Sequence, residues 1–62
     1  MNTKTATVLL PGDSYKGGTV TRTSGPHFTE KGQVIRLTVR FLSFGRPVFE
    51  TFDIPTLTPV AQ

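Results

Sequence analysis

Two arginines in the second half of the chain are spaced so that they can bind an anionic polymer. Arg36 and Arg40 lie four residues apart, and the odd-numbered positions around them are Ile, Leu, Val and Phe. This period of two predicts a strand with one apolar face and one solvent face, on which both arginines fall about 13 Å apart. Thr38 lies between them as a hydroxyl donor. Neighbouring positions on that face are about 6.6 Å apart, which suits successive phosphates of a nucleic-acid strand.

Three further side chains extend this candidate surface. Lys31 precedes the strand and Arg46 follows it, so both add positive charge. Phe49 is expected to project from the same face and to offer a ring on which a base can stack. A positive groove interleaved with aromatic rings is typical of proteins that bind single strands with little sequence preference.

Two acidic residues, Glu50 and Asp53, suggest an alternative role for the same surface. Either carboxylate could pair with Arg36, and Phe49 could pack under the loops or in an oligomer interface. The two carboxylates are expected on opposite faces of their strand, so they cannot act as a paired acid and base. The sequence contains no nucleophile–base motif, phosphate-binding loop or set of metal ligands, so we expect neither catalysis nor a cofactor.

The segment 22–29 is a second candidate, and it is expected to be a mobile loop because it contains glycine and proline. Phe28 could stack on a base, or it could fold back to cap one end of a small barrel. In the order Arg22, Gly25, Pro26, Phe28, the segment resembles the single-stranded-DNA-binding proteins of filamentous phages. The resemblance implies a small OB-like barrel that coats single strands cooperatively as a dimer.

Charge and length restrict the classes of function. Seven Lys and Arg against four Asp and Glu give a net charge of +3, which favours nucleic acid or an acidic protein surface as the partner. A chain of 62 residues forms one small domain with a marginal core. It has no cysteine and one histidine, so disulfides and a closed zinc site are not available to reinforce it. Self-association remains, and we expect a dimer or a higher oligomer.

The composition predicts strands throughout, because the chain has eleven threonines besides its Val, Ile and Phe. The longest predicted element is a hairpin over residues 33–54, with strands at about 33–43 and 48–54 and a type II′ turn at Gly45-Arg46. Shorter strands are predicted over 6–10 and 19–23, the second of which alternates around Val20 and Arg22. Pro11-Gly12-Asp13 and the glycines at 17 and 18 mark the connections.

These elements predict an all-β fold, a small antiparallel β-barrel or curved sheet of four to five strands, OB-like or SH3-like, over residues 1–54. Residues 55–62 contain two prolines and are expected to form an extended C-terminal arm, which is either disordered or binds a partner. No apolar run approaches the roughly 20 residues needed to cross a bilayer, and no secretory signal is visible. We therefore expect a cytoplasmic protein that does not bind membranes.

The sequence therefore predicts a non-enzymatic protein that binds nucleic acid, preferably single-stranded DNA, through a basic strand face and aromatic stacking. The alternative is a small phage- or plasmid-type module, an inhibitor or assembly component that binds a protein through a strand edge or the C-terminal arm. The candidate binding residues are Arg22, Phe28, Lys31, Arg36, Arg40, Arg46 and Phe49.

Overall fold

The computed structural model describes residues 2–62, and this part of the chain contains six strands, one short 3₁₀ helix and no α-helix. Four strands form an antiparallel sheet in the order β2-β3-β4-β5, while β1 and β6 pair with each other. The predicted all-β fold with a curled antiparallel sheet is confirmed. The elements are β1 (Thr3–Thr5), η1 (Ala6–Val8), β2 (Ser14–Tyr15), β3 (Gly18–Thr29), β4 (Gly32–Ser43), β5 (Arg46–Pro55) and β6 (Pro59–Ala61).

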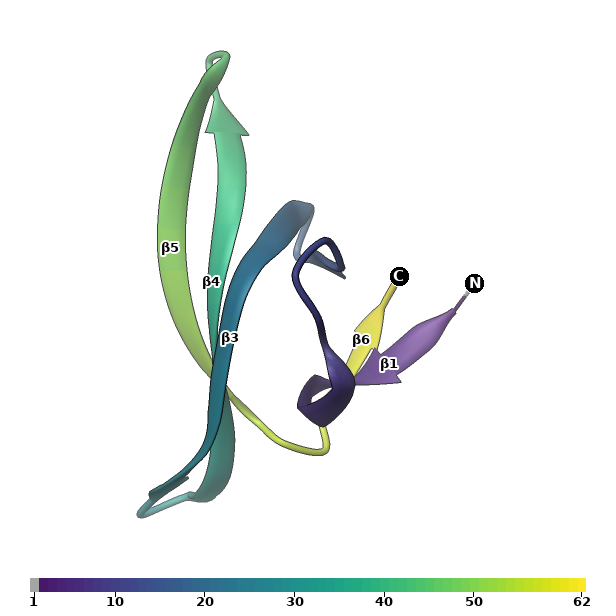
Figure 1. Cartoon of the computed structure of the whole chain (residues 1–62), viewed down its shortest axis with the longest axis vertical. Helices are drawn as coiled ribbons and strands as arrows, with labels where there is room; N and C mark the ends of the chain where they lie inside the picture. Colours follow the sequence, from purple (N-terminus) through teal and green to yellow (C-terminus); the bar gives the residue numbers. More distant parts are fainter. Residues whose placement is uncertain (1) are drawn as a thin grey trace.

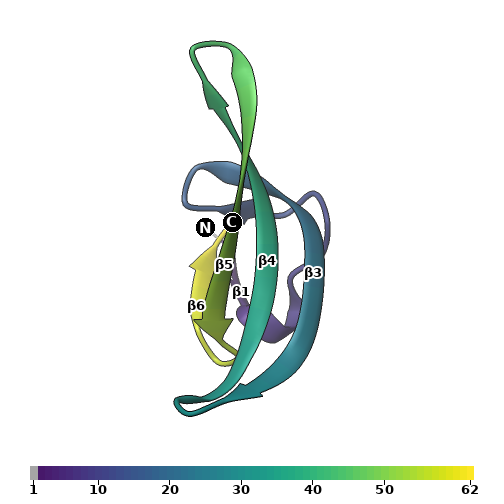
Figure 2. The same ribbon diagram turned by 90° about the vertical axis from the view of Figure 1, so that its left-hand side faces the viewer.

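A single small core lies between the four-stranded sheet and the two ends of the chain (Figures 1 and 2). The apolar positions of β4 point into it as the period of two predicts, and Leu37 and Val39 are completely buried. Because the sheet covers only one side of these residues, the opposite side has to be closed by other segments. Those segments contribute the buried side chains of Ala6, Leu9 and Val60.

The hairpin of β4 and β5 is longer than the core, and its tip projects beyond the rest of the molecule (Figures 1 and 2). Its loop is Phe44-Gly45, with φ of 51° and 78°, which is the pattern of a type I′ turn. The predicted turn at Gly45-Arg46 and the register derived from it are therefore wrong by two residues. Because side chains alternate with a period of two, this shift leaves the residues of the two predicted strands, 33–43 and 48–54, on their predicted faces.

The segment 22–29, predicted as a mobile loop, is instead part of β3, which pairs with β4 as far as Thr29 and Gly32. Glycine and proline are accommodated by a register shift between Ser24 and His27, after which the pairing resumes. Irregularities of this kind let a strand absorb residues that do not suit a regular ladder. The long alternating sequence of β4 offers a partner to the whole segment.

The strand predicted over residues 6–10 is also wrong, because Ala6–Val8 forms η1. The backbone N–H of Ala6 donates to the carbonyl of Thr58 at 2.9 Å, and that of Leu9 turns back to the carbonyl of Ala6 at 3.2 Å. One helical turn brings Ala6 and Leu9 to the same side, and both are buried in the core.

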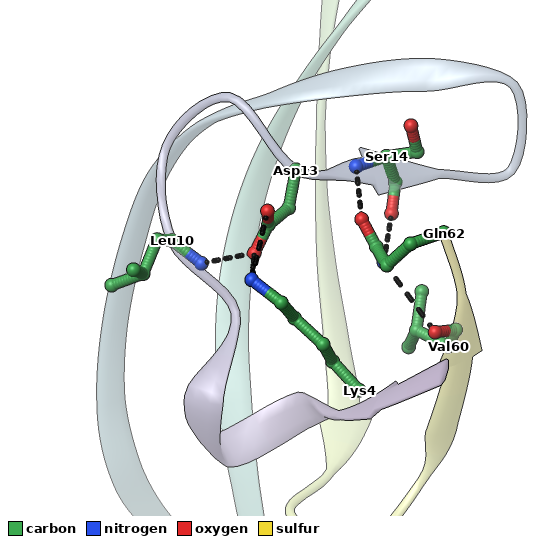
Figure 3. Close-up of polar contacts among 6 residues, drawn as sticks. All are labelled: Lys4, Leu10, Asp13, Ser14, Val60 and Gln62. Carbon is green, nitrogen blue, oxygen red and sulfur yellow. Dashed lines mark hydrogen bonds and ion pairs between the residues drawn. The ribbon is translucent and has the colours of Figure 1, made fainter. Parts of the chain in front are cut away.

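The C-terminal residues belong to the fold and do not form a separate arm. β6 pairs with β1, and Val60 is buried in the core. The amide of Gln62 accepts a hydrogen bond from the N–H of Ser14 at 2.8 Å and donates one to the carbonyl of Ser14 at 3.0 Å (Figure 3). Both chain ends are therefore tied to the start of the main sheet.

Asp13 ties the turn before β2 to β1. Its carboxylate accepts hydrogen bonds from the N–H of Leu10 at 2.8 Å and from Lys4 Nζ at 3.1 Å (Figure 3). The Leu10 N–H and then the Lys4 ammonium lower the pKa of Asp13 below its ordinary value. Both contacts favour the ionised carboxylate, so this end of the fold depends on pH.

We expect the fold to lose stability in acid through Asp13. A carboxylate whose pKa is lower in the folded chain stabilises the fold above the unfolded pKa of about 3.9, and this contribution disappears as the pH falls through the lowered value. Asp13→Asn should therefore lower the melting temperature at neutral pH, and its difference from the wild type should shrink as the pH falls through the lowered pKa of Asp13. Thermal unfolding followed by circular dichroism across this range measures both. Glu30→Gln, in an exposed turn, is the control, and equal behaviour of the two variants would contradict the assignment.

Candidate nucleic-acid interface

One face of the main sheet points away from the core and carries most of the predicted binding residues; we call it the outer face. The strand pairing aligns its side chains in three cross-strand rows, each with one residue from β3, β4 and β5. Polar, cationic and aromatic groups share these rows, and none of the core residues belongs to them. The rows are Ser24–Arg36–Asp53, Arg22–Thr38–Thr51 and Thr19–Arg40–Phe49.

Arg22 reaches the outer face because of an irregularity in β3. Val20 pairs with Val39 on the core side, and simple alternation would place Arg22 on that side as well. The register shifts between Val20 and Arg22, so that Thr21 is the extra residue and Arg22 pairs with Thr38. A bulge of this kind changes the face on which the following residues lie. It keeps a charged side chain out of the core and adds it to the basic surface.

The three arginines of the outer face form a triangle. Arg36 and Arg40 are separated by four residues of β4, while Arg22 lies on the neighbouring strand at the level of Thr38. Strand geometry places Arg22 about 8 Å from each of the other two, measured between backbone positions. Arginine side chains are long enough for two of these guanidinium groups to meet at one anion, or for each to bind a separate anion. The triangle can therefore bind neighbouring phosphates of one strand.

Arg36 does not stand free on this face, because it forms a two-point ion pair with Asp53. Its Nε donates to Oδ1 at 2.8 Å and Nη2 donates to Oδ2 at 3.2 Å. The Arg36 hydrogen bonds, followed by the charges of Arg36 and His27, lower the pKa of Asp53. Of the two carboxylates considered as partners of Arg36, Asp53 is the one that pairs with it. The pair still fixes the guanidinium in place, and its other N–H groups can donate to an anion.

Arg40 and Phe49 lie directly opposite each other on β4 and β5. Hydrogen-bonded and non-hydrogen-bonded residue pairs alternate along an antiparallel hairpin, beginning with the bonded pair Ser43 and Arg46 that flanks the two-residue loop. By this alternation Arg40 and Phe49 are a non-hydrogen-bonded pair, in which the two side chains lie closer together. Phe49 is 60% exposed. Neither Arg40 nor Arg22 forms an ion pair with any residue between 2 and 62. This row therefore combines a free cation with an exposed ring.

Lys31 continues the outer face at the turn between β3 and β4. It lines an open hollow of about 650 Å³ whose apolar floor includes Val34, which is buried although it lies on the side away from the core. Lys31 and Arg46 lie at opposite ends of β4, so they cannot bind the same short anion. The hollow is lined by Thr29, Glu30, Lys31, Val34, Asp53 and Pro55.

Phe28 and Arg46 do not belong to this surface, contrary to prediction. Phe28 pairs with Gln33, and Arg46 pairs with Ser43. Gln33 and Ser43 are odd-numbered, like the core-facing residues of β4, and residues paired across two strands point to the same side of the sheet. Phe28 and Arg46 therefore point to the opposite side of the sheet from Arg40. Phe28 is 78% exposed, but it lies beyond the end of the core and cannot stack on a strand that follows the outer face.

The hydroxyl groups of the outer face were missed by sequence reasoning, apart from Thr38. Ser24, Thr51 and Thr19 lie beside the arginines in the three rows. Ser24 Oγ is 3.1 Å from Nε2 of His27, which places the imidazole at the edge of the same face. The abundance of threonine was visible in the sequence, but the register shift between Val20 and Arg22 decides that Ser24 faces outward.

Glu50 and Asp53 lie on opposite faces of β5, as predicted. Glu50 pairs with Val39 on the core side, and Asp53 pairs with Arg36 on the outer face. Between residues 2 and 62 there is no group of three His, Cys, Asp or Glu side chains that could hold a metal ion. No helix in the same range is long and apolar enough to cross a membrane. Comparisons with protein-family models, curated proteins and solved structures return no match, so the geometry of the outer face is the basis for assigning a function.

Proposed function

We propose that the chain binds single-stranded nucleic acid, with DNA preferred, along the outer face, without a chemical step and without a cofactor. The observation that supports this proposal most directly is the gathering of Arg22, Arg36 and Arg40 on one exposed sheet face together with Phe49. The excess of basic over acidic residues attracts a polyanion to this small domain. The proposed compartment is the cytoplasm.

In this proposal each group of the outer face has a separate role. Arg22 and Arg40 bind phosphates by charge, and Arg36 adds the N–H groups that its pair with Asp53 leaves free. Phe49 stacks on a base of the bound strand. The bases of an unpaired strand are accessible for this contact, whereas a base in a duplex would first have to leave its stack. Hydroxyl groups such as that of Thr38 donate to phosphate oxygens between the arginines. None of these contacts reads a base edge, so little sequence preference is expected.

The second candidate is a protein-binding module, and one observation favours it. β5 ends the order of the main sheet, so its outer edge is available to a strand of another chain. The C-terminal segment cannot serve this purpose as an arm, because β6 is already paired with β1. The two functions differ in their response to salt, since phosphate binding weakens steeply as salt rises.

Replacing Phe49 tests the proposed stacking. Phe49→Ala should weaken the binding of a fluorescently labelled oligo-dT by about 1–3 kcal/mol, which is roughly 5- to 150-fold in affinity. Phe28→Ala is the matched control, because it removes an exposed ring from the opposite side of the sheet and should leave affinity unchanged. Fluorescence anisotropy titrations at low salt measure both. Absence of binding by the wild type, or equal losses in the two variants, would refute the proposed site.

A further inference from the structure

The outer edge of β5 carries a short, bounded set of unpaired backbone groups. Ser43 and Arg46 flank the two-residue loop and form a hydrogen-bonded pair. Because the backbone N–H and C=O groups of successive strand residues point alternately to either side, those of Pro47 and of every second residue after it point away from β4. The N–H groups of Phe49, Thr51 and Asp53 therefore point outward. Pro47 and Pro55 hold the flanking outward positions, where a missing N–H does not disturb the pairing with β4.

The chain also exposes more surface than a compact protein of its size. Its accessible surface is 4498 Å², whereas a compact monomer of 6.8 kDa is expected to expose about 3,950 Å². The hairpin that projects beyond the core adds to this exposed surface (Figures 1 and 2). Large apolar side chains lie exposed along it and at the turn after β5, namely Leu42, Phe44, Val48, Phe49 and Leu57. A strand paired to this edge would cover part of this surface.

We propose that a second copy of the chain occupies this edge, through antiparallel pairing of β5 with β5 about a two-fold axis at Thr51. Pro47 and Pro55 are each four residues from Thr51, so in this register each proline lies opposite the other proline of the partner. Every outward N–H then meets a carbonyl of the other chain. Thr51 faces the partner's Thr51, and Phe49 faces the partner's Asp53.

Neighbouring registers fit less well. An axis at Glu50 places this carboxylate opposite the partner's Glu50, and like charges directly opposite each other are unfavourable. An axis at Phe52 pairs Phe49 with the partner's Pro55, which has no N–H to donate. The axis at Thr51 instead sets Val48 opposite the partner's Ile54. It also brings the hairpin tip to the level of the partner's Leu57, which is otherwise exposed.

The pairing joins the two main sheets into one, and the outer faces become continuous. Phe49 is then flanked by Arg40 of its own chain and, beyond the partner's Asp53, by the partner's Arg36. Each copy thus contributes a residue to the surface next to the other copy's stacking ring. This doubling of the binding surface rests on the proposed function, whereas the pairing of the chains does not.

Single cysteines test the register, because the chain has no cysteine of its own. Opposite residues of a hydrogen-bonded antiparallel pair have Cα atoms about 5.5 Å apart, within the range that a disulfide spans. Thr51→Cys should therefore oxidise to a covalent dimer. Thr38→Cys, its partner on β4 in the same row, lies one strand further from the axis and should remain a monomer on a non-reducing gel. Equal cross-linking of the two variants would overturn the register.

Added charge tests the interface without oxidation. Thr51→Lys places two ammonium groups opposite each other at the axis, whereas Thr38→Lys adds the same charge to the same face away from it. By sedimentation equilibrium, the wild type and Thr38→Lys should have twice the monomer mass of 6.8 kDa and Thr51→Lys should have the monomer mass. A monomeric wild type would overturn the pairing even if oligonucleotides bind. A dimer that binds no oligonucleotide would overturn only the proposed function.

Discussion

Leu37→Ala is expected to destabilise the protein by about 2–5 kcal/mol, the largest effect of any single substitution that we consider. Leu37 is 0% exposed at the centre of β4 and belongs to the core that the sheet shares with both chain ends. Truncation removes apolar burial and leaves a cavity that the surrounding side chains fill only in part. A domain of this length has a total stability of only about 3–9 kcal/mol. We therefore expect a large unfolded fraction at room temperature.

The matched control is Leu42→Ala, the same substitution in the same strand at a side chain that is 71% exposed. Exposed positions away from packed contacts usually change stability by less than about 0.5 kcal/mol. Urea unfolding followed by circular dichroism gives both free energies of unfolding. If the two variants unfold at the same urea concentration, the core is not where the structure places it.

The double variant Arg22→Ala/Arg40→Ala is expected to lose most of its affinity for single-stranded DNA. If each arginine neutralises one phosphate, the plot of log affinity against log salt becomes shallower by about 1.4, since each contact contributes about 0.7. At about 0.1 M salt this corresponds to a loss of roughly 25-fold. Arg36 is left in place because its removal would also leave Asp53 without its partner. Titrations with labelled oligo-dT at several salt concentrations measure the slope.

A control with the same change in net charge separates the outer face from a general electrostatic effect. Arg46→Ala/Lys16→Ala also removes two cations, one on the opposite side of the hairpin and one in the turn beside Tyr15. Its salt dependence should stay close to that of the wild type. Identical slopes for the two double variants would show that net charge drives binding, and the outer face would lose its assignment.

The strand of the arginines was predictable because its pattern is local. The alternation of residues 35–41 predicted a half-buried strand, and β4 buries Ile35, Leu37 and Val39. The predicted faces of the hairpin survived an error of two residues in register, because that error is a whole period of the strand. Arg36 and Arg40 lie on one face because of this alternation alone, and Phe49 joins them through the pairing of β5 with β4.

The residues of β3 were less predictable because two irregularities interrupt its alternation. Val20 and Arg22 share a parity in the sequence, yet they lie on opposite faces since Thr21 is an extra residue. The prediction of a loop over 22–29 failed because it relied on the glycine and proline in this segment and did not include the pairing that β4 offers. Whether such a segment forms a strand depends on the strand available to pair with it, and local propensities carry no information about that partner.

The chain ends were misjudged for a similar reason. Pro55 and Pro59 argued against a strand, but a short edge pair such as β1 and β6 tolerates proline. Only the assembled sheet reveals that its concave side needs Ala6, Leu9 and Val60 to close the core. A segment that looks like a free terminus is then required for burial.

From its own pattern, the sequence determined an all-β chain with a two-faced hairpin, arginines on the side away from the core, and no membrane-spanning run. The tertiary structure alone decided that Arg22 joins these arginines, that Arg36 is paired with Asp53, and that Phe28 and Arg46 point elsewhere. The physical reason is the range of the interactions. Alternation depends on neighbours in the chain, whereas bulges, registers and ion pairs depend on which strands meet across space.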